Sequence, residues 1–180
     1  MASTNKKSIA SALIGNILEW YDFAIYGYFA SAIGLAFFPK SDSTAQLLMA
    51  FSIFAVGYLM RPIGAVIFGH VGDKYGKKVA LNLSVAAMAI PTFFVSILPD
   101  YNAWGVWAAY TLGLLRMIQG LSVGGEFTTS IIYLVSHAPK NKQSLMGATI
   151  TCGAIGGILL GSFTGDLMNH LMSEETINAW

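Results

Sequence analysis

Five long apolar runs, joined only by short polar turns, occupy most of this 180-residue chain. Each run reaches the roughly 20 residues that an α-helix needs to cross about 30 Å of hydrocarbon. A helix is the expected structure, because an open strand in lipid would leave its backbone polar groups without hydrogen bonds. We therefore predict an all-α membrane protein with spans at about residues 9–38, 47–69, 79–98, 104–135 and 145–168.

The composition agrees with a membrane protein and argues against several other classes. Charged residues make up 11% of the chain, against roughly 25% in soluble domains. The net charge of +1, with no basic stripe outside the turns, argues against a nucleic-acid-binding protein. The chain has no nucleophile–base constellation and no His or Cys spacing typical of a metal site, so we expect neither an enzyme nor a metal or other cofactor.

The basic residues of the turns predict which side of the membrane each turn faces. Those of the N-terminal tail and of the turns after the second and fourth spans are Lys6, Lys7, Lys74, Lys77, Lys78, Lys140 and Lys142. Lys40 is the only basic residue in the turns on the opposite side. Because basic residues favour the cytoplasmic side, we expect a multi-pass membrane protein with a cytoplasmic N-terminus.

Ionisable residues also lie inside the predicted spans, where facing lipid would be costly. Glu19 and Asp22 are three residues apart in the first span, on one helical face with Tyr26 one turn further along. Arg61 lies in the second span at nearly the same depth as Glu19, so these two side chains could pair. Asp22 and Arg116, which belongs to the fourth span, are likewise both well inside.

Two interpretations of these residues remain open. They could be structural, satisfying one another in a static bundle, and this alternative is most serious for Arg61 because it is close to a helix end. For Glu19, Asp22 and Arg116 we favour a functional role, since buried carboxylates carry protons and Arg binds organic anions. Glu126 could be a proton site or an anchor for the residues around it. The candidates for proton or substrate binding are Glu19, Asp22, Tyr26, Arg61, Arg116, Gln119 and Glu126.

Glycines recur every four residues in the last two spans. The positions are Gly120 and Gly124 in the fourth span, and Gly153, Gly157 and Gly161 in the fifth. Small residues at this spacing allow the backbones of neighbouring helices to approach closely. We expect these glycines to serve helix packing, although the pattern is common among membrane proteins.

Four separated motifs resemble a known superfamily. Residues 69–78, Gly-His-Val-Gly-Asp-Lys-Tyr-Gly-Lys-Lys, resemble the cytoplasmic loop motif of the major facilitator superfamily, G-x-L-x-D-[RK]-x-G-[RK]-[RK], with Val71 in place of Leu. Residues 15–23, 61–64 and 116–126 resemble the metabolite:proton symporter family within it. That family includes proline/betaine, α-ketoglutarate, citrate and shikimate carriers. The similarity extends over essentially the whole chain.

The resemblance implies a major-facilitator-type helical bundle, in which two six-span halves alternate access to a central cavity. Residues 1–180 would form about five transmembrane helices of the N-terminal half, with the C-terminal half missing. In that fold the first and fourth spans, which carry Glu19, Asp22 and Arg116, line the cavity. The loop motif would act as a cytoplasmic gate, in which Asp73 latches against the other half. The residues of this gate motif are Gly69, Asp73, Lys74, Gly76, Lys77 and Lys78.

Two functions from different classes are compatible with the sequence. The first, which we favour, is proton-coupled symport of a small organic acid or zwitterionic osmolyte by alternating access, with the proton as coupling ion. The second is a truncated, non-transporting membrane protein that acts as a structural or regulatory partner of another subunit. It arises because a chain that ended at Trp180 would lack half of the cavity and the opposing gate. Residues 127–130 depart from the small glycines of many relatives, so the resemblance leaves the substrate unidentified.

Overall fold

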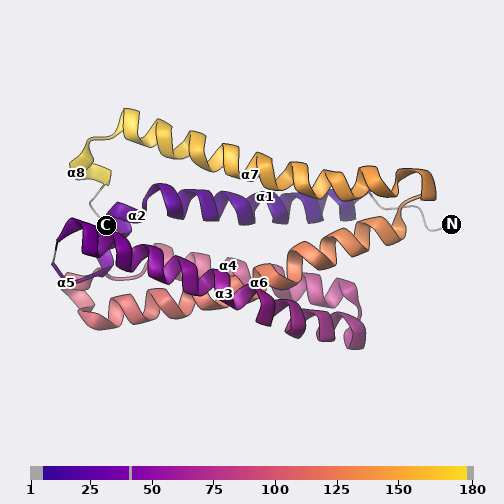
Figure 1. Ribbon diagram of the computed structural model, residues 1–180, viewed down its shortest axis with the longest axis horizontal. Helices are drawn as coiled ribbons and strands as arrows, with labels where there is room; N and C mark the ends of the chain where they lie inside the picture. Colours follow the sequence, from indigo (N-terminus) through magenta and orange to yellow (C-terminus); the bar gives the residue numbers. More distant parts are fainter. Residues whose placement is uncertain (1–5, 41, 178–180) are drawn as a thin grey trace.

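Long helices run back and forth along one direction in the computed structural model (Figure 1). The structure describes residues 6–40 and 42–177, with their side chains except at 6–12, 126–129, 133, 137, 174 and 175. The elements are α1 (Lys6–Tyr28), α2 (Ala30–Phe37), α3 (Ser43–Tyr75), α4 (Lys77–Ser96), α5 (Tyr101–Trp104), α6 (Val106–His137), a 3₁₀ turn η1 (Lys140–Lys142), α7 (Gln143–Leu171) and α8 (Glu174–Ile177). The fold class is therefore all-α, as the apolar runs predicted.

Each predicted span corresponds to a helical segment, but the ends differ. The first span, residues 9–38, consists of two helices, α1 and α2, that meet at Phe29. The hydrogen bonds continue across this junction, because the Phe29 N–H donates to the Ile25 carbonyl and the Ile33 N–H donates to the Phe29 carbonyl, both at 2.9 Å. The chain direction is thus maintained through the break. The helices α3 and α7 extend beyond their predicted spans at both ends.

The motif at residues 69–78 is largely helical, which corrects its placement in a loop between the second and third spans. Helix α3 continues through Tyr75 and α4 begins at Lys77, so the reversal is concentrated at Gly76. Gly76 has φ 96°, a conformation that costs glycine little because it has no Cβ. Its N–H donates to the Gly72 carbonyl at 3.1 Å, which ends α3. The length of an apolar run indicates which part of a helix lies in lipid and says little about how far the helix extends into water.

Three of the described helices are long and apolar enough to cross a membrane: α3, α4 and the stretch Lys140–Leu171, which contains α7. The two other long helices, α1 and α6, carry the buried charged residues Glu19 and Arg116. The number of five spans remains a prediction. Leu59, Val66, Phe93, Trp107 and Leu171 have side chains from 62% to 76% exposed. Apolar exposure of this kind fits a surface in contact with lipid.

The helices form two groups that meet along α6. Helix α1 packs against α7, while α3 and α4 pack against α6 (Figure 1). Close contact between α3 and α6 depends on glycine, because a Cβ at Gly120 would overlap the Gly57 carbonyl oxygen and one at Gly124 would overlap that of Arg61. The corresponding glycines of α7 against α1 are Gly153, Gly157 and Gly161.

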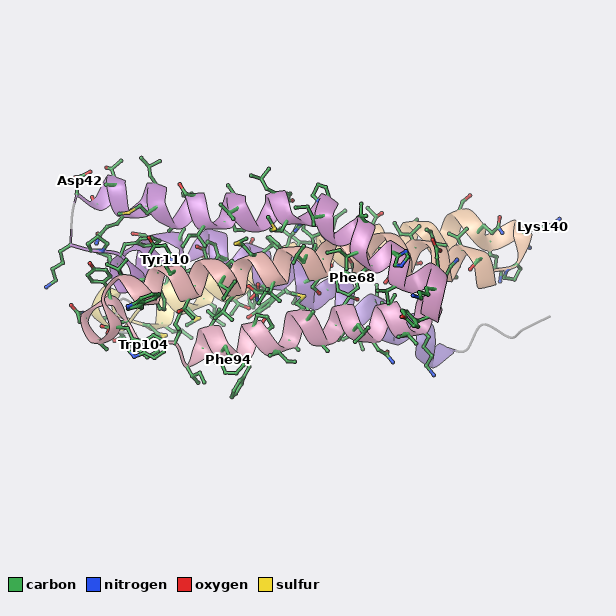
Figure 2. The ribbon with its side chains drawn as sticks, turned by 90° about the horizontal axis from the view of Figure 1, so that it is seen from below. Asp42, Phe68, Phe94, Trp104, Tyr110 and Lys140 are labelled. Carbon is green, nitrogen blue, oxygen red and sulfur yellow. The ribbon has the colours of Figure 1, made fainter. Side chains whose placement is uncertain are left out.

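The predicted basic turns lie at one end of the bundle. The turn at Lys140 lies opposite the end that holds Asp42 and Trp104 (Figure 2). The start of α1 and the connection between α3 and α4 lie at the same end as the turn between α6 and α7 (Figure 1). This clustering is what a cytoplasmic basic face requires, although the sidedness itself stays a prediction.

Candidate functional site

A buried ion pair joins α1 to α6. Arg116 Nη1 donates to Asp22 Oδ2 at 2.7 Å, and the two side chains are 9% and 18% exposed. The guanidinium also lies over the ring of Tyr26, with Cζ 4.1 Å from the ring centroid. Tyr26 is in turn held by its hydroxyl, which donates to the Ala50 carbonyl of α3 at 2.8 Å. Charge-assisted hydrogen bonds of this length are among the stronger ones in proteins. The structure therefore brings together three of the predicted residues, which lie on two helices.

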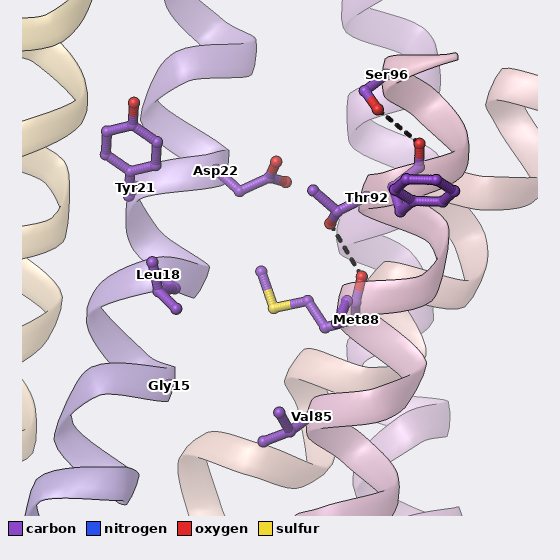
Figure 3. Close-up of a pocket in the computed structure, with 10 residues that line it drawn as sticks. Gly15, Leu18, Tyr21, Asp22, Val85, Met88, Thr92 and Ser96 are labelled. Carbon is purple, nitrogen blue, oxygen red and sulfur yellow. Dashed lines mark hydrogen bonds between the residues drawn. The ribbon is translucent and has the colours of Figure 1, made fainter. Parts of the chain in front are cut away.

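Asp22 also lines a cavity of about 490 Å³ between α1 and α4 (Figure 3). The residues that line this cavity are Gly15, Leu18, Tyr21, Asp22, Val85, Met88, Ala89, Thr92, Phe93 and Ser96. Of these ten, only Asp22 has a charged side chain. Its carboxylate points from α1 towards Thr92 on α4 (Figure 3). The carboxylate that pairs with Arg116 is thus the one charged group on the wall of a largely apolar cavity.

Gln119 extends this polar group to α4. Its Nε2 donates to Thr92 Oγ1 at 2.7 Å, and Thr92 Oγ1 donates to the Met88 carbonyl at 2.9 Å. Gln119 is 2% exposed, and its Oε1 has no hydrogen-bond partner among the residues that the structure describes. Gln119 and Arg116 are three residues apart on α6 and so lie on the same side of that helix. The four side chains Asp22, Arg116, Gln119 and Thr92 thus connect α1, α6 and α4.

A second charged group lies between α1, α3 and α6. The Arg61 guanidinium rests against three aromatic rings, with Cζ 3.9 Å from the centroid of Tyr58, 4.2 Å from that of Phe23 and 5.4 Å from that of Trp20. Each distance is within the range of a cation–π interaction. Tyr58 is three residues before Arg61 on α3, while Trp20 and Phe23 belong to α1.

Arg61 also lines a cavity of about 320 Å³, together with Glu19, Trp20, Pro62, Ala65, Val123 and Gly124. Glu19 is fully buried and interacts electrostatically with Arg61. The two residues that the depth comparison placed at the same level therefore line one cavity. Because Glu19 and Asp22 face different partners, the structure divides the predicted site residues into two groups. One contains Glu19 and Arg61, and the other contains Asp22, Tyr26, Arg116 and Gln119.

Two further predictions have different outcomes. The side chain of Glu126 lies outside the described residues, so its role as a proton site stays a prediction. Gly69, Asp73 and Lys77 of the gate motif line a small cavity of about 80 Å³ with Gly124 and others, far smaller than the two cavities near the charged groups. Asp73 itself is exposed.

Comparison with known proteins gives a consistent result. The sequence profile described as "Sugar (and other) transporter" matches residues 8–180. The chain belongs to this family of the major facilitator superfamily.

Several relatives of this chain are named as transporters of osmolytes. It is 40% identical over 175 residues to a glycine betaine/proline/ectoine/pipecolic acid transporter of Dickeya dadantii. It is 39% and 38% identical to the proline/betaine transporters of Salmonella typhimurium and Escherichia coli K12. In each case the match covers 97% of this chain and 35% of the relative, so the chain spans about a third of their length. No solved structure matches it. The family and the membrane helices identify a multi-pass membrane protein that is not an enzyme.

The neutral side chains that lie close to the buried charged residues were not identified from the sequence. Asn16 is 1% exposed, and its Nδ2 donates to the Ile150 carbonyl of α7 at 2.6 Å. It precedes Glu19 by three residues, so helical spacing could have placed it on the same face. Tyr58 could have been found in the same way from Arg61. Thr92 offers no such signal, because its partner Gln119 lies on another helix.

Proposed function

We propose that the chain forms part of a secondary active transporter that moves a small zwitterionic osmolyte or organic acid together with protons, by alternating access. The observation that carries this proposal is the buried ion pair between Asp22 of α1 and Arg116 of α6. Ionisable residues inside a membrane bundle commonly mark proton or substrate pathways. The family and the relatives, which are named as glycine betaine and proline transporters, support a transporter of osmolytes.

The ion pair offers a direct means of coupling. A proton that binds the Asp22 carboxylate removes the negative charge that holds Arg116. The contact between α1 and α6 then loses its charged link, and the guanidinium becomes able to bind another anion. Loss of the proton restores the pair. One carboxylate thereby alternates between a proton and an arginine, and each state favours a different arrangement of the two helices.

The membrane orientation and the gate belong to the same proposal. We place the N-terminus in the cytoplasm of a bacterial cell and the protein in the inner membrane, because the basic turns lie at one end of the bundle. Residues 69–78 would then lie on the cytoplasmic side and act as the gate that the family resemblance implies. The proton is the coupling ion, the substrate is a small molecule, and the remainder of the transporter faces this bundle across the substrate path.

Uptake into membrane vesicles tests the coupling. The protein is produced from its complete coding sequence, and uptake of radiolabelled glycine betaine is measured with and without an inward proton gradient. We expect accumulation only with the gradient, and its loss or uncoupling in Asp22→Asn. Asp42→Asn is the matched control. Asp42 caps α3 at the surface by accepting a hydrogen bond from the Thr44 N–H, and Asn caps a helix equally well.

A double variant separates a transport role from a purely structural one. Removing one partner of a buried ion pair leaves an uncompensated charge, whereas removing both charges is often tolerated. Asp22→Asn combined with Arg116→Gln should therefore fold as well as the unaltered protein but should not accumulate substrate. Full gradient-driven uptake by this double variant would show that the pair serves only to hold the bundle together.

A further inference from the structure

Three buried N–H donors around one cavity lack an acceptor. They are Trp20 Nε1, Arg61 Nε and Arg61 Nη2, and none has a hydrogen-bond partner among the described residues. Both residues line the cavity of about 320 Å³ between α1, α3 and α6. Buried polar groups in proteins are nearly always hydrogen-bonded, so each orphaned donor requires an explanation. Three donors of the same kind at one cavity indicate an acceptor that occupies it in another state of the protein.

The two Arg61 nitrogen atoms among these donors indicate that the acceptor is a carboxylate. Nε and Nη2 lie on the same edge of the guanidinium, and this edge can donate two parallel hydrogen bonds to the two oxygens of a carboxylate. The Arg61 guanidinium is also held in place, since its carbon lies 3.9 Å and 4.2 Å from the ring centroids of Tyr58 and Phe23. The ring contacts fix the position of the guanidinium, and neither Nε nor Nη2 donates a hydrogen bond to another described residue.

We propose that this cavity binds the carboxylate of the transported substrate, with Arg61 Nε and Nη2 donating to its two oxygens and Trp20 Nε1 donating to one of them. This inference rests on the proposed transport function and names the part of the chain that recognises the substrate. The Asp22–Arg116 ion pair does not line this cavity and remains the element that couples transport to the proton.

Glu19 indicates which class of carboxylate fits. It is fully buried, lines the same cavity and interacts electrostatically with Arg61. A simple organic anion would bring a second negative charge next to Glu19, and like charges at close range repel. A zwitterion brings its own positive group, which Glu19 attracts. The cavity therefore suits a zwitterionic carboxylate, such as an amino acid or a betaine, better than a simple organic acid.

Binding to the purified protein tests this site without a proton gradient. The protein, produced from its complete coding sequence and placed in lipid nanodiscs, is titrated by calorimetry with three probes. Glycine betaine has both charges, 3,3-dimethylbutanoate has the same shape without the positive charge, and choline lacks the carboxylate. We expect glycine betaine to bind at least about tenfold more tightly than either of the others, since charge-assisted contacts are lost in each case.

Two substitutions test the donors separately. Arg61→Lys keeps the positive charge but loses the two-donor edge, and we expect glycine betaine to bind about 10- to 100-fold more weakly. Trp20→Phe keeps an aromatic face but loses the Nε1 donor, and we expect a loss of about 2- to 10-fold. Trp107→Phe is the matched control, because Trp107 is 73% exposed on the outer surface, and its affinity should be unchanged.

The outcomes distinguish this site from the transport proposal. Unchanged affinity in folded Arg61→Lys would overturn the carboxylate site, and unchanged affinity in Trp20→Phe would do so even if Arg61→Lys failed to fold. Equal affinity for glycine betaine and 3,3-dimethylbutanoate would overturn the zwitterion assignment. Because none of these measurements uses a gradient, they can succeed where proton-coupled uptake fails, and the reverse also holds.

Discussion

Two adjacent glycines of α7 should respond oppositely to the same substitution. Gly157 faces α1, and a Cβ built on it would overlap the Ile17 carbonyl oxygen and lie 2.9 Å from Trp20 Cβ and 3.0 Å from Tyr21 N. At Gly156, such a Cβ would meet no other part of the described chain within 4 Å. Gly156→Ala is therefore a control for Gly157→Ala in the same helix, with the same change in composition and the same change in helix propensity.

The expected difference follows from these contacts. Alanine in a helix is favoured over glycine by about 0.5–1 kcal/mol, so Gly156→Ala should raise the free energy of unfolding by that amount. Gly157→Ala gains the same term but must push α1 away from α7. Overpacking typically costs about 1–3 kcal/mol, and the upper end applies because the obstructing atoms belong largely to the backbone. We expect Gly157→Ala to be less stable than Gly156→Ala by about 3 kcal/mol.

The assay is denaturant unfolding in detergent, followed by the helical signal in circular dichroism. The comparison uses the unaltered protein and both variants under identical conditions. Equal stability of the two variants would refute the close approach of α1 and α7 on which the reasoning depends. A greater loss in Gly156→Ala would refute it more strongly, because that result would place the open side of α7 against α1.

Two other predictions concern the ends of the bundle. Gly76→Ala should lower the free energy of unfolding by about 1–2 kcal/mol, because Gly76 has φ 96°. Gly69→Ala is the contrasting variant: Gly69 lies inside α3 and a new Cβ would meet no other part of the described chain within 4 Å, so it should raise the free energy of unfolding by about 0.5–1 kcal/mol in the same assay. The Asn102 amide and the Ala103 N–H hold the pKa of Asp100 below its usual value. The resulting stabilisation is present above the unfolded-state pKa and is lost as pH falls through the folded-state pKa. Asn102→Ala should raise that pKa towards its usual value, because the largest cause of the lowering is lost, as measured by an NMR titration of the carboxyl group.

The sequence correctly indicated which ionisable residues lie close together inside the bundle, because such residues are costly in lipid. Because the rise per residue is nearly constant in a helix, the position of a residue along its span gives its depth. These depths placed Glu19 at the level of Arg61, and placed both Asp22 and Arg116 well inside the bundle. The sequence could not say which face of α1 meets which helix. Phe23 beside Arg61 and Thr92 beside Gln119 depend on that tertiary arrangement.

The ends of the helices were predicted less well, for a different reason. Helix α3 continues to Tyr75 through residues that read as a polar turn, since hydropathy marks the lipid-facing part of a helix and not its hydrogen-bonded end. The junction at Phe29 falls within one continuous apolar run, so no change of composition marked it.

Helix α1 links both charged groups, and Gly157→Ala would displace the part of α1 that does so. Glu19 and Trp20 line the cavity with Arg61, while Asp22 pairs with Arg116. The atoms that obstruct a methyl group at Gly157 belong to Ile17, Trp20 and Tyr21 of this same stretch. Binding constellations tolerate displacements of only about 0.5 Å. We therefore expect Gly157→Ala to weaken glycine betaine binding and uptake as well as stability, whereas Gly156→Ala leaves them unchanged. Full binding and uptake by a destabilised Gly157→Ala variant would show that the position of α1 is not what holds these residues in working geometry.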